Sequence, residues 1–184
     1  ELSAPHIKKI YLITDLWCSR DAQWTQSYAM HLPSHYALHI LDAPALGGID
    51  PNTNNEQEIH AQFLSFGIDK AVDKILSLQL SGHLFIGCSI GGLLLWRAAL
   101  QGMFVSKLVA ISATRLRFET CRPSCDLRLY FGRTDDNKPD QTWASAVKVT
   151  DLLFKQGGHD IYKDTNNVHQ IIKELKELQW IDPE

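Results

Sequence analysis

The chain has 184 residues, 45% of them hydrophobic and 21% charged, which is an ordinary composition for a soluble globular protein and predicts one domain over residues 1–184. Its net charge of −3 is scattered along the sequence, so we expect neither a nucleic-acid face nor a surface for anionic lipid. No apolar run approaches the roughly twenty residues that cross a bilayer, and no charged-then-apolar leader opens the sequence, so we expect no membrane segment.

Apolar runs rich in Val, Ile and Leu alternate with helical patterns along the chain. The expected strands are Ile7–Thr14, Tyr36–Asp42, His83–Gly87, Lys107–Ser112, Asp126–Gly132 and Val147–Phe154. The expected helices are Ala22–His31, Glu56–Leu80, Ile90–Gln101, a short one near Pro139–Ala146, and Asn166–Leu178. Because strands this continuously apolar leave no face for solvent, they predict a three-layer α/β/α sandwich with a mainly parallel six-stranded sheet.

Six linkers leave the carboxyl ends of the expected strands. They are Asp15–Asp21, Ala43–Asn55, Cys88–Ile90, Ala113–Cys125, Arg133–Lys138 and Lys155–Thr165. Open parallel sheets bind their ligands outside the carboxyl ends of strands, so we expect the functional site among these six linkers.

The cysteines are too few and too irregularly spaced for a disulfide framework. Reduced thiols in a cytoplasm are the simplest interpretation of all four, Cys18, Cys88, Cys121 and Cys125. No second cysteine pair completes a zinc site with Cys121 and Cys125, and no glycine-rich stretch has the spacing of a phosphate-binding loop. We therefore expect neither a metal nor a cofactor.

The strongest local signal is Gly87-Cys88-Ser89-Ile90-Gly91, which follows an apolar strand and opens an apolar helix. A serine at so sharp a turn needs very small residues two positions before and after it, because the helix passes close to the strand. The turn places Ser89 at the amino end of the helix, where the N–H of Ile90 can stabilise an oxyanion. The alternative is a tight glycine turn whose serine only caps the helix.

A serine hydroxyl is a poor nucleophile at neutral pH and needs a histidine base that a carboxylate orients. Asp135 follows the end of the fifth strand and is our choice for the carboxylate, with Asp136 as the fallback. His159 is the one histidine of eight in a glycine-flanked loop at the carboxyl end of a strand, so we expect it to be the base. Without its two partners, we would interpret His159 as a solvated loop residue.

With nucleophile, acid and base in the order Ser89, Asp135 and His159, the sequence resembles the α/β-hydrolase superfamily. In that family the loop after the first core strand gives the second oxyanion donor, and a His-Gly pair is common there. The resemblance implies that the Trp17 backbone N–H is this donor, beside that of Ile90. In this sequence Asp15-Leu16 stands in place of His-Gly. The replacement brings an extra carboxylate, that of Asp15, near the site, and the sequence leaves the role of this carboxylate open.

Members of the family often carry a helical lid, whereas only the segment Ala113–Cys125 follows the fourth strand here. We therefore expect an open, lid-less site whose border is formed by four apolar side chains, Trp17, Leu46, Phe118 and Trp143. The alternative is that the loop Ala43–Asn55 folds over the site. A narrower similarity, to esterases that act on pimeloyl groups of a carrier protein, rests on the Trp17 loop and on Ser89–Gly92.

The same short segment holds three arginines, Arg115, Arg117 and Arg122. They could bind an anionic substrate or the acidic face of a carrier protein, and the alternative is solvated surface. The sequence thus predicts a small cytoplasmic hydrolase that cleaves a carboxylic ester or thioester through an acyl-enzyme on Ser89. A catalytically silent protein of the same fold that binds a ligand or partner is the second hypothesis, and the oligomeric state stays open.

Overall fold

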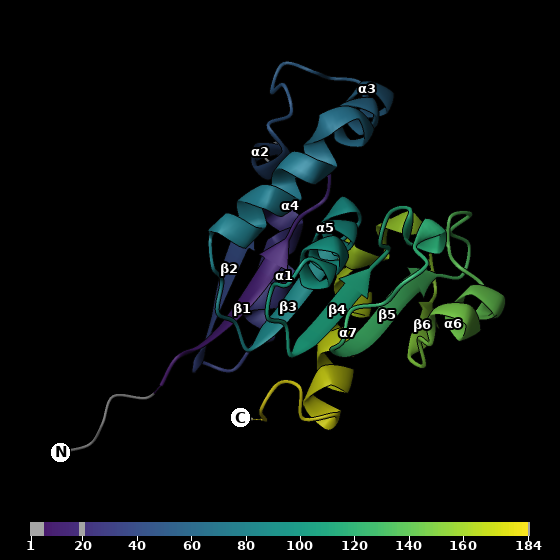
Figure 1. The fold of residues 1–184 in the computed structure, drawn as a ribbon. Helices are drawn as coiled ribbons and strands as arrows, with labels where there is room; N and C mark the ends of the chain where they lie inside the picture. Colours follow the sequence, from purple (N-terminus) through teal and green to yellow (C-terminus); the bar gives the residue numbers. More distant parts are fainter. Residues whose placement is uncertain (1–5, 19–20, 184) are drawn as a thin grey trace.

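The computed structural model describes residues 6–18 and 21–183. Its centre is one sheet of six strands in the order β2-β1-β3-β4-β5-β6 (Figure 1). The strands are β1 (Lys8–Ile13), β2 (Tyr36–Leu41), β3 (Leu84–Cys88), β4 (Lys107–Ile111), β5 (Asp126–Gly132) and β6 (Leu152–Lys155). All five pairings are parallel, so their carboxyl ends meet at one edge of the sheet.

Two apolar clusters, one on each face, hold the sheet between its helices. Alternate residues of a strand point to opposite faces, so Tyr11 and Ile13 join one cluster while Ile10 and Leu12 join the other. The first cluster is covered by α2 (Ala43–Gly47), α3 (Glu56–Gln62), the π-helical η2 (Phe63–Gly67), α4 (Ile68–Ser77), α5 (Ile90–Leu100) and α6 (Gln141–Val147). The second is covered by η1 (Gln23–Thr25), α1 (Gln26–Met30), η4 (His159–Lys163) and α7 (Thr165–Glu177). This arrangement confirms the predicted three-layer sandwich.

The sixth expected strand is wrong at its start. Val147 is the last residue of α6, and Lys148 after it takes a left-handed conformation with φ of 62°. Val147 and Val149 are buried in the first cluster at the end of this helix, so their apolarity serves helix packing, and β6 begins only at Leu152.

The long expected helix and the second expected linker also differ in detail. The helix Glu56–Leu80 ends at Ser77 and contains the π-helical η2. The linker Ala43–Asn55 begins with the short helix α2, which carries Pro44 in its first turn. At Gly47 an added Cβ would lie 3.0 Å from the carbonyl oxygen of Gly67, so α2 and η2 approach each other at glycines.

Four of the loops at the carboxyl edge of the sheet carry most residues of the candidate site. They follow β3, β4, β5 and β6, the second of them carrying the 3-10 turn η3 (Leu116–Phe118). Within residues 6–18 and 21–183, no helix is long and apolar enough to span a membrane.

Candidate active site

Ser89 lies at the turn between β3 and α5 in a strained backbone conformation, with φ of 54° and ψ of −122°. The residues two positions away are glycines because backbone fills the space around them. A Cβ on Gly91 would lie 2.3 Å from the carbonyl oxygen of Ile13, and one on Gly87 would lie 2.5 Å from the Cα of Gly92. The predicted strand–turn–helix geometry is therefore present.

Hydrogen bonds connect Ser89 to the two partners that the sequence predicted. The Oγ of Ser89 is 2.9 Å from Nε2 of His159, and Nδ1 of His159 is 3.2 Å from Oδ2 of Asp135. An ionised carboxylate only accepts hydrogen bonds, so Nδ1 donates to Asp135. The Nε2 of the neutral ring is then left to accept the proton of the Ser89 hydroxyl.

Asp135 rather than Asp136 faces the histidine. Asp135 is 4% exposed, and its Oδ1 accepts the backbone N–H of Asn137 at 2.9 Å, while Asp136 is exposed. The two loops meet at Gly132, where an added Cβ would lie 2.1 Å from the carbonyl oxygen of Gly158. This close approach of backbones brings His159 beside Asp135.

Thr114 is a neighbour of Ser89 that the sequence analysis missed. Its hydroxyl lies 3.0 Å from the Oγ of Ser89, and its backbone N–H donates to the carbonyl of Ser89 at 3.1 Å. If Ser89 gives its one proton to His159, the Thr114 hydroxyl donates to the Ser89 oxygen. The only signal in the sequence is the position of Thr114 just after a strand.

The two predicted oxyanion donors differ in their surroundings. Ile90 is the first residue of α5, so its N–H has no acceptor within the helix. The Trp17 N–H donates at 3.0 Å to Oδ1 of Asp15.

The Asp15 carboxylate, 1% exposed, connects the Trp17 loop to the turn that carries His159. Its Oδ2 accepts the hydroxyl of Tyr162 at 2.8 Å and lies 3.5 Å from the Nζ of Lys163. Burial raises the pKa of the Tyr162 hydroxyl well above its ordinary value, and the neighbouring charge of Asp15 raises it further. The Tyr162 ring in turn meets the His159 ring edge-on, with centroids 5.9 Å apart.

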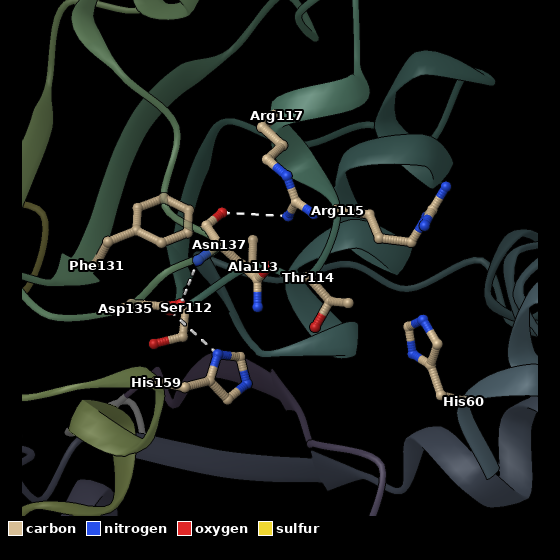
Figure 2. A pocket seen from close by; sticks show the side chains of 10 residues that line it. All are labelled: His60, Ser112, Ala113, Thr114, Arg115, Arg117, Phe131, Asp135, Asn137 and His159. Atoms are coloured by element: carbon tan, nitrogen blue, oxygen red, sulfur yellow. Dashed lines mark hydrogen bonds and ion pairs between the residues drawn. The ribbon is translucent and has the colours of Figure 1, made fainter. Parts of the chain in front are cut away.

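A cavity of about 120 Å³ opens beside His159 (Figure 2). Its wall consists of His60, Ser112, Ala113, Thr114, Arg115, Arg117, Phe131, Asp135, Asn137 and His159. Ser89 is not part of this wall, but Thr114 and His159, the two side chains that its hydroxyl contacts, both are.

None of the four apolar side chains expected around the site forms this wall. Trp17 packs against the first core cluster, and Leu46 lies at a separate surface depression beside α4. Phe118 is 56% exposed. Trp143 donates its indole N–H to the carbonyl of Glu119 at 2.9 Å and packs against Trp96.

The three arginines of the segment after β4 separate into two kinds. Arg115 and Arg117 line the cavity. Arg122 instead donates hydrogen bonds to three backbone carbonyls, those of Pro123, Cys125 and Lys148, which tie the segment to the end of α6.

The four cysteines are free thiols. Cys88, next to the serine, is fully buried, and this burial raises the pKa of its thiol well above the ordinary value. In the part of the chain that the structure describes, no group of three metal-ligating side chains gathers.

Comparisons with known proteins show a likeness in structure alone. No protein-family model matches the chain, and no curated protein matches its sequence. A protein from Xanthomonas campestris, named as a hydrolase of the alpha/beta superfamily, matches with a TM-score of 0.62 and 14% identity, over 93% of this chain and 99% of that one.

Two further solved structures have names that specify an activity. The esterase domain of a Rhodothermus marinus protein matches with a TM-score of 0.59 and 15% identity, over 97% of this chain and 88% of that one. The Vlm2 thioesterase domain matches with a TM-score of 0.55 and 10% identity, over 92% of this chain and 96% of that one. From its sheet, its strand–serine–helix turn and these likenesses, the chain has the α/β-hydrolase fold.

Proposed function

We propose that the protein is a serine hydrolase that cleaves a carboxylic ester or thioester through an acyl-enzyme on Ser89. The observation that carries this proposal is the unbroken line of hydrogen bonds from Ser89 through His159 to the buried Asp135. The names of the structural neighbours, among them an esterase and a thioesterase, support the same class of chemistry.

The first half of the proposed reaction forms the acyl-enzyme. Ser89 Oγ attacks the carbonyl carbon of the substrate while its proton passes to Nε2 of His159, and Asp135 stabilises the charged ring. Collapse of the tetrahedral intermediate breaks the bond to the leaving alcohol or thiol, which takes the proton back from Nε2. In the second half a water molecule, deprotonated by His159, releases the acid and restores Ser89.

The oxyanion of the intermediate needs donors of hydrogen bonds. The N–H of Ile90 at the amino end of α5 suits this role, and losing one such donor typically costs about 100- to 1000-fold in rate. The Trp17 N–H remains our prediction for the second donor, and it would have to exchange its bond to Asp15 for one to the oxyanion.

The occupied Trp17 N–H favours one other candidate, a silent protein that keeps the fold and binds a ligand or partner. Treatment with a fluorophosphonate, followed by peptide mapping, separates the two candidates. We expect the label on Ser89, and we expect Ser89→Ala and His159→Ala to prevent it while circular dichroism shows both variants folded. A folded protein that takes no label, or a label that survives Ser89→Ala, contradicts the proposal.

The leaving group is decided by a second assay. p-Nitrophenyl esters and the matching acyl thioesters are compared at equal acyl length, and the ratio of their kcat/KM values distinguishes an esterase from a thioesterase. The Ser89→Ala protein gives the background rate for each substrate.

A further inference from the structure

Two arginines lie across the cavity from His159, and the proposed hydrolysis does not use them (Figure 2). Arg115 and Arg117 both come from the segment between β4 and β5. Their guanidinium groups lie over the same ring, 4.8 and 4.3 Å from the centroid of Phe118. Such cation–π contacts hold both charges against one side chain, while Figure 2 shows the Arg115 head group pointing toward His60 and that of Arg117 toward Asn137. The exposed Phe118 thus supports the arginines and does not itself line the cavity.

These two charges have no carboxylate partner among the residues that the structure describes. Within the described ranges, the one hydrogen bond that Arg117 donates is to the backbone carbonyl of Asn137, at 3.3 Å. Elsewhere in the chain, Arg97 pairs with Glu119 at 2.9 Å and Arg128 with Glu174 at 3.4 Å. Two positive groups that line one cavity, with no described carboxylate to neutralise either of them, favour a negatively charged ligand there.

Ser112 supplies an independent sign that the cavity receives a polar group. It is 1% exposed, lines the cavity, and has a hydroxyl without a hydrogen-bond partner among the described residues. Its backbone is strained, with φ of 53°, and so is that of Arg115, with φ of 61°. Strain and an unsatisfied buried hydroxyl both cost stability, and they persist at sites where a ligand uses them.

We infer that this cavity binds a carboxylate of the substrate, so that the ester or thioester cleaved at Ser89 is small and carries a second, free carboxyl group held by Arg115 and Arg117. The inference rests on the proposed hydrolysis for the identity of the reacting bond. Guanidinium groups bind carboxylates through paired hydrogen bonds, and a carboxylate is among the smallest anions that they bind in this way. At about 120 Å³ the cavity is well below the roughly 300–1,000 Å³ of pockets for larger ligands.

An acidic protein partner is the other source of carboxylates, and the structure favours it less. Arg115 and Arg117 are half-buried in a concave wall, whereas Arg122, the third arginine of the segment, is engaged by backbone carbonyls. A flat protein face would contact the arginines without using the cavity or Ser112.

The test compares 4-nitrophenyl hydrogen glutarate with 4-nitrophenyl pentanoate, which has the same chain length and no charge. A second pair places the charge on the leaving side, as the butyryl thioester of 3-mercaptopropionate and of its methyl ester. We expect the charged member of one pair to be hydrolysed with a kcat/KM at least tenfold higher than its neutral partner. The pair that shows the preference tells whether the carboxylate belongs to the acyl group or to the leaving group.

Variants then connect the preference to the arginines. We expect Arg115→Gln and Arg117→Gln each to lower the charged-to-neutral ratio of kcat/KM by roughly tenfold to 100-fold, as expected for a hydrogen bond to a charged group. Arg133→Gln is the matched control, because Arg133 is exposed, lies outside the cavity wall, and its loss changes the net charge equally. It should leave the ratio unchanged.

Glutarate binding to the Ser89→Ala protein, measured by calorimetry, separates the inference from the proposed function. If neither substrate pair is hydrolysed but glutarate binds and Arg115→Gln weakens it, the hydrolase proposal fails and the carboxylate site stands. If the neutral substrates are hydrolysed as well as the charged ones, the inference is wrong and the hydrolase proposal stands. If glutarate fails to bind, the inference is wrong, and hydrolysis of either pair alone decides the hydrolase proposal. An acidic protein that binds through the arginines without any charged-substrate preference also overturns it.

Discussion

The position of His159 depends on how closely its loop approaches the end of β5, and Gly132→Ala tests this directly. The new Cβ would lie 2.1 Å from the carbonyl oxygen of Gly158 and 2.3 Å from that of Gly157. Real Cβ atoms essentially never approach closer than 3.0 Å, so the loop must move by at least about 0.9 Å. Both neighbours are backbone atoms, and no side chain can rotate away to relieve the contact.

A shift of this size acts on the residue directly after Gly158. It would disturb the bond of 2.9 Å from His159 to Ser89 and the bond of 3.2 Å to Asp135. A displacement of about 1 Å can cost 100-fold in rate, so we expect Gly132→Ala to lower the rate of fluorophosphonate labelling about 100-fold. Crowding of this kind also destabilises, by about 1–3 kcal/mol, which urea unfolding would measure.

Gly158→Ala is the matched control in the same loop. Its added Cβ would meet only the hydroxyl of Thr134, at 3.6 Å, and its φ of −100° suits alanine. We expect this variant to label within a few-fold of the wild type. Wild-type labelling by a folded Gly132→Ala protein would refute the reasoning, and an equal loss in Gly158→Ala would show that any alanine in this loop disturbs the site.

Three further predictions concern neighbours of the site. Asp15→Asn leaves either the Trp17 N–H or the Tyr162 hydroxyl without an acceptor. We therefore expect the free energy of unfolding in urea to fall by about 1–3 kcal/mol. An unchanged free energy would contradict the role given to Asp15. Thr114→Val removes the hydroxyl that lies 3.0 Å from Ser89 Oγ, so we expect fluorophosphonate labelling to slow about tenfold. Thr114→Ser keeps a hydroxyl and should label at the wild-type rate. Equal labelling rates in the two variants would exclude this hydrogen bond from the reaction. Burial lowers the pKa of His60, and the charge of Arg115 lowers it further. NMR titration should therefore show the His60 pKa raised in Arg115→Gln and unchanged in Arg133→Gln. An unchanged pKa in Arg115→Gln would place the guanidinium far from His60.

The features that the sequence predicted well are those decided within a few consecutive residues. Gly87 and Gly91 flank Ser89 because backbone atoms of neighbouring elements leave no room for a Cβ, and this requirement is visible in five letters. The parallel sheet also followed from local patterns, because its strands are buried on both faces and therefore apolar throughout. The contact of His159 with Ser89 and Asp135 could be predicted because both partners of the serine stand just after strand ends that share one edge of the sheet.

The features that the sequence did not predict depend on contacts between distant segments. Val147 was predicted to begin a strand, but it is the last residue of α6 and packs into the first core cluster. Trp143 was expected at the border of the site, but it packs against Trp96, donates to the carbonyl of Glu119 and does not line the cavity beside His159. Thr114 became a partner of Ser89 only through the pairing of β3 with β4, which places the ends of these strands side by side.

Asp15 shows how an unusual residue can be a consequence of the site around it. Its carboxylate accepts the N–H of Trp17 in one loop and the hydroxyl of Tyr162 in another, and Tyr162 packs against His159. A buried charge is tolerated only when such partners compensate it, so Asp15 holds the loop after β1 and the turn of the histidine in one arrangement. The same bonds occupy the N–H that we predict for the oxyanion. A hydrolase with this loop must therefore either release the Trp17 N–H from Asp15 during the reaction or stabilise the oxyanion with the Ile90 N–H and a further donor. A catalytically silent protein that binds a ligand or partner requires neither.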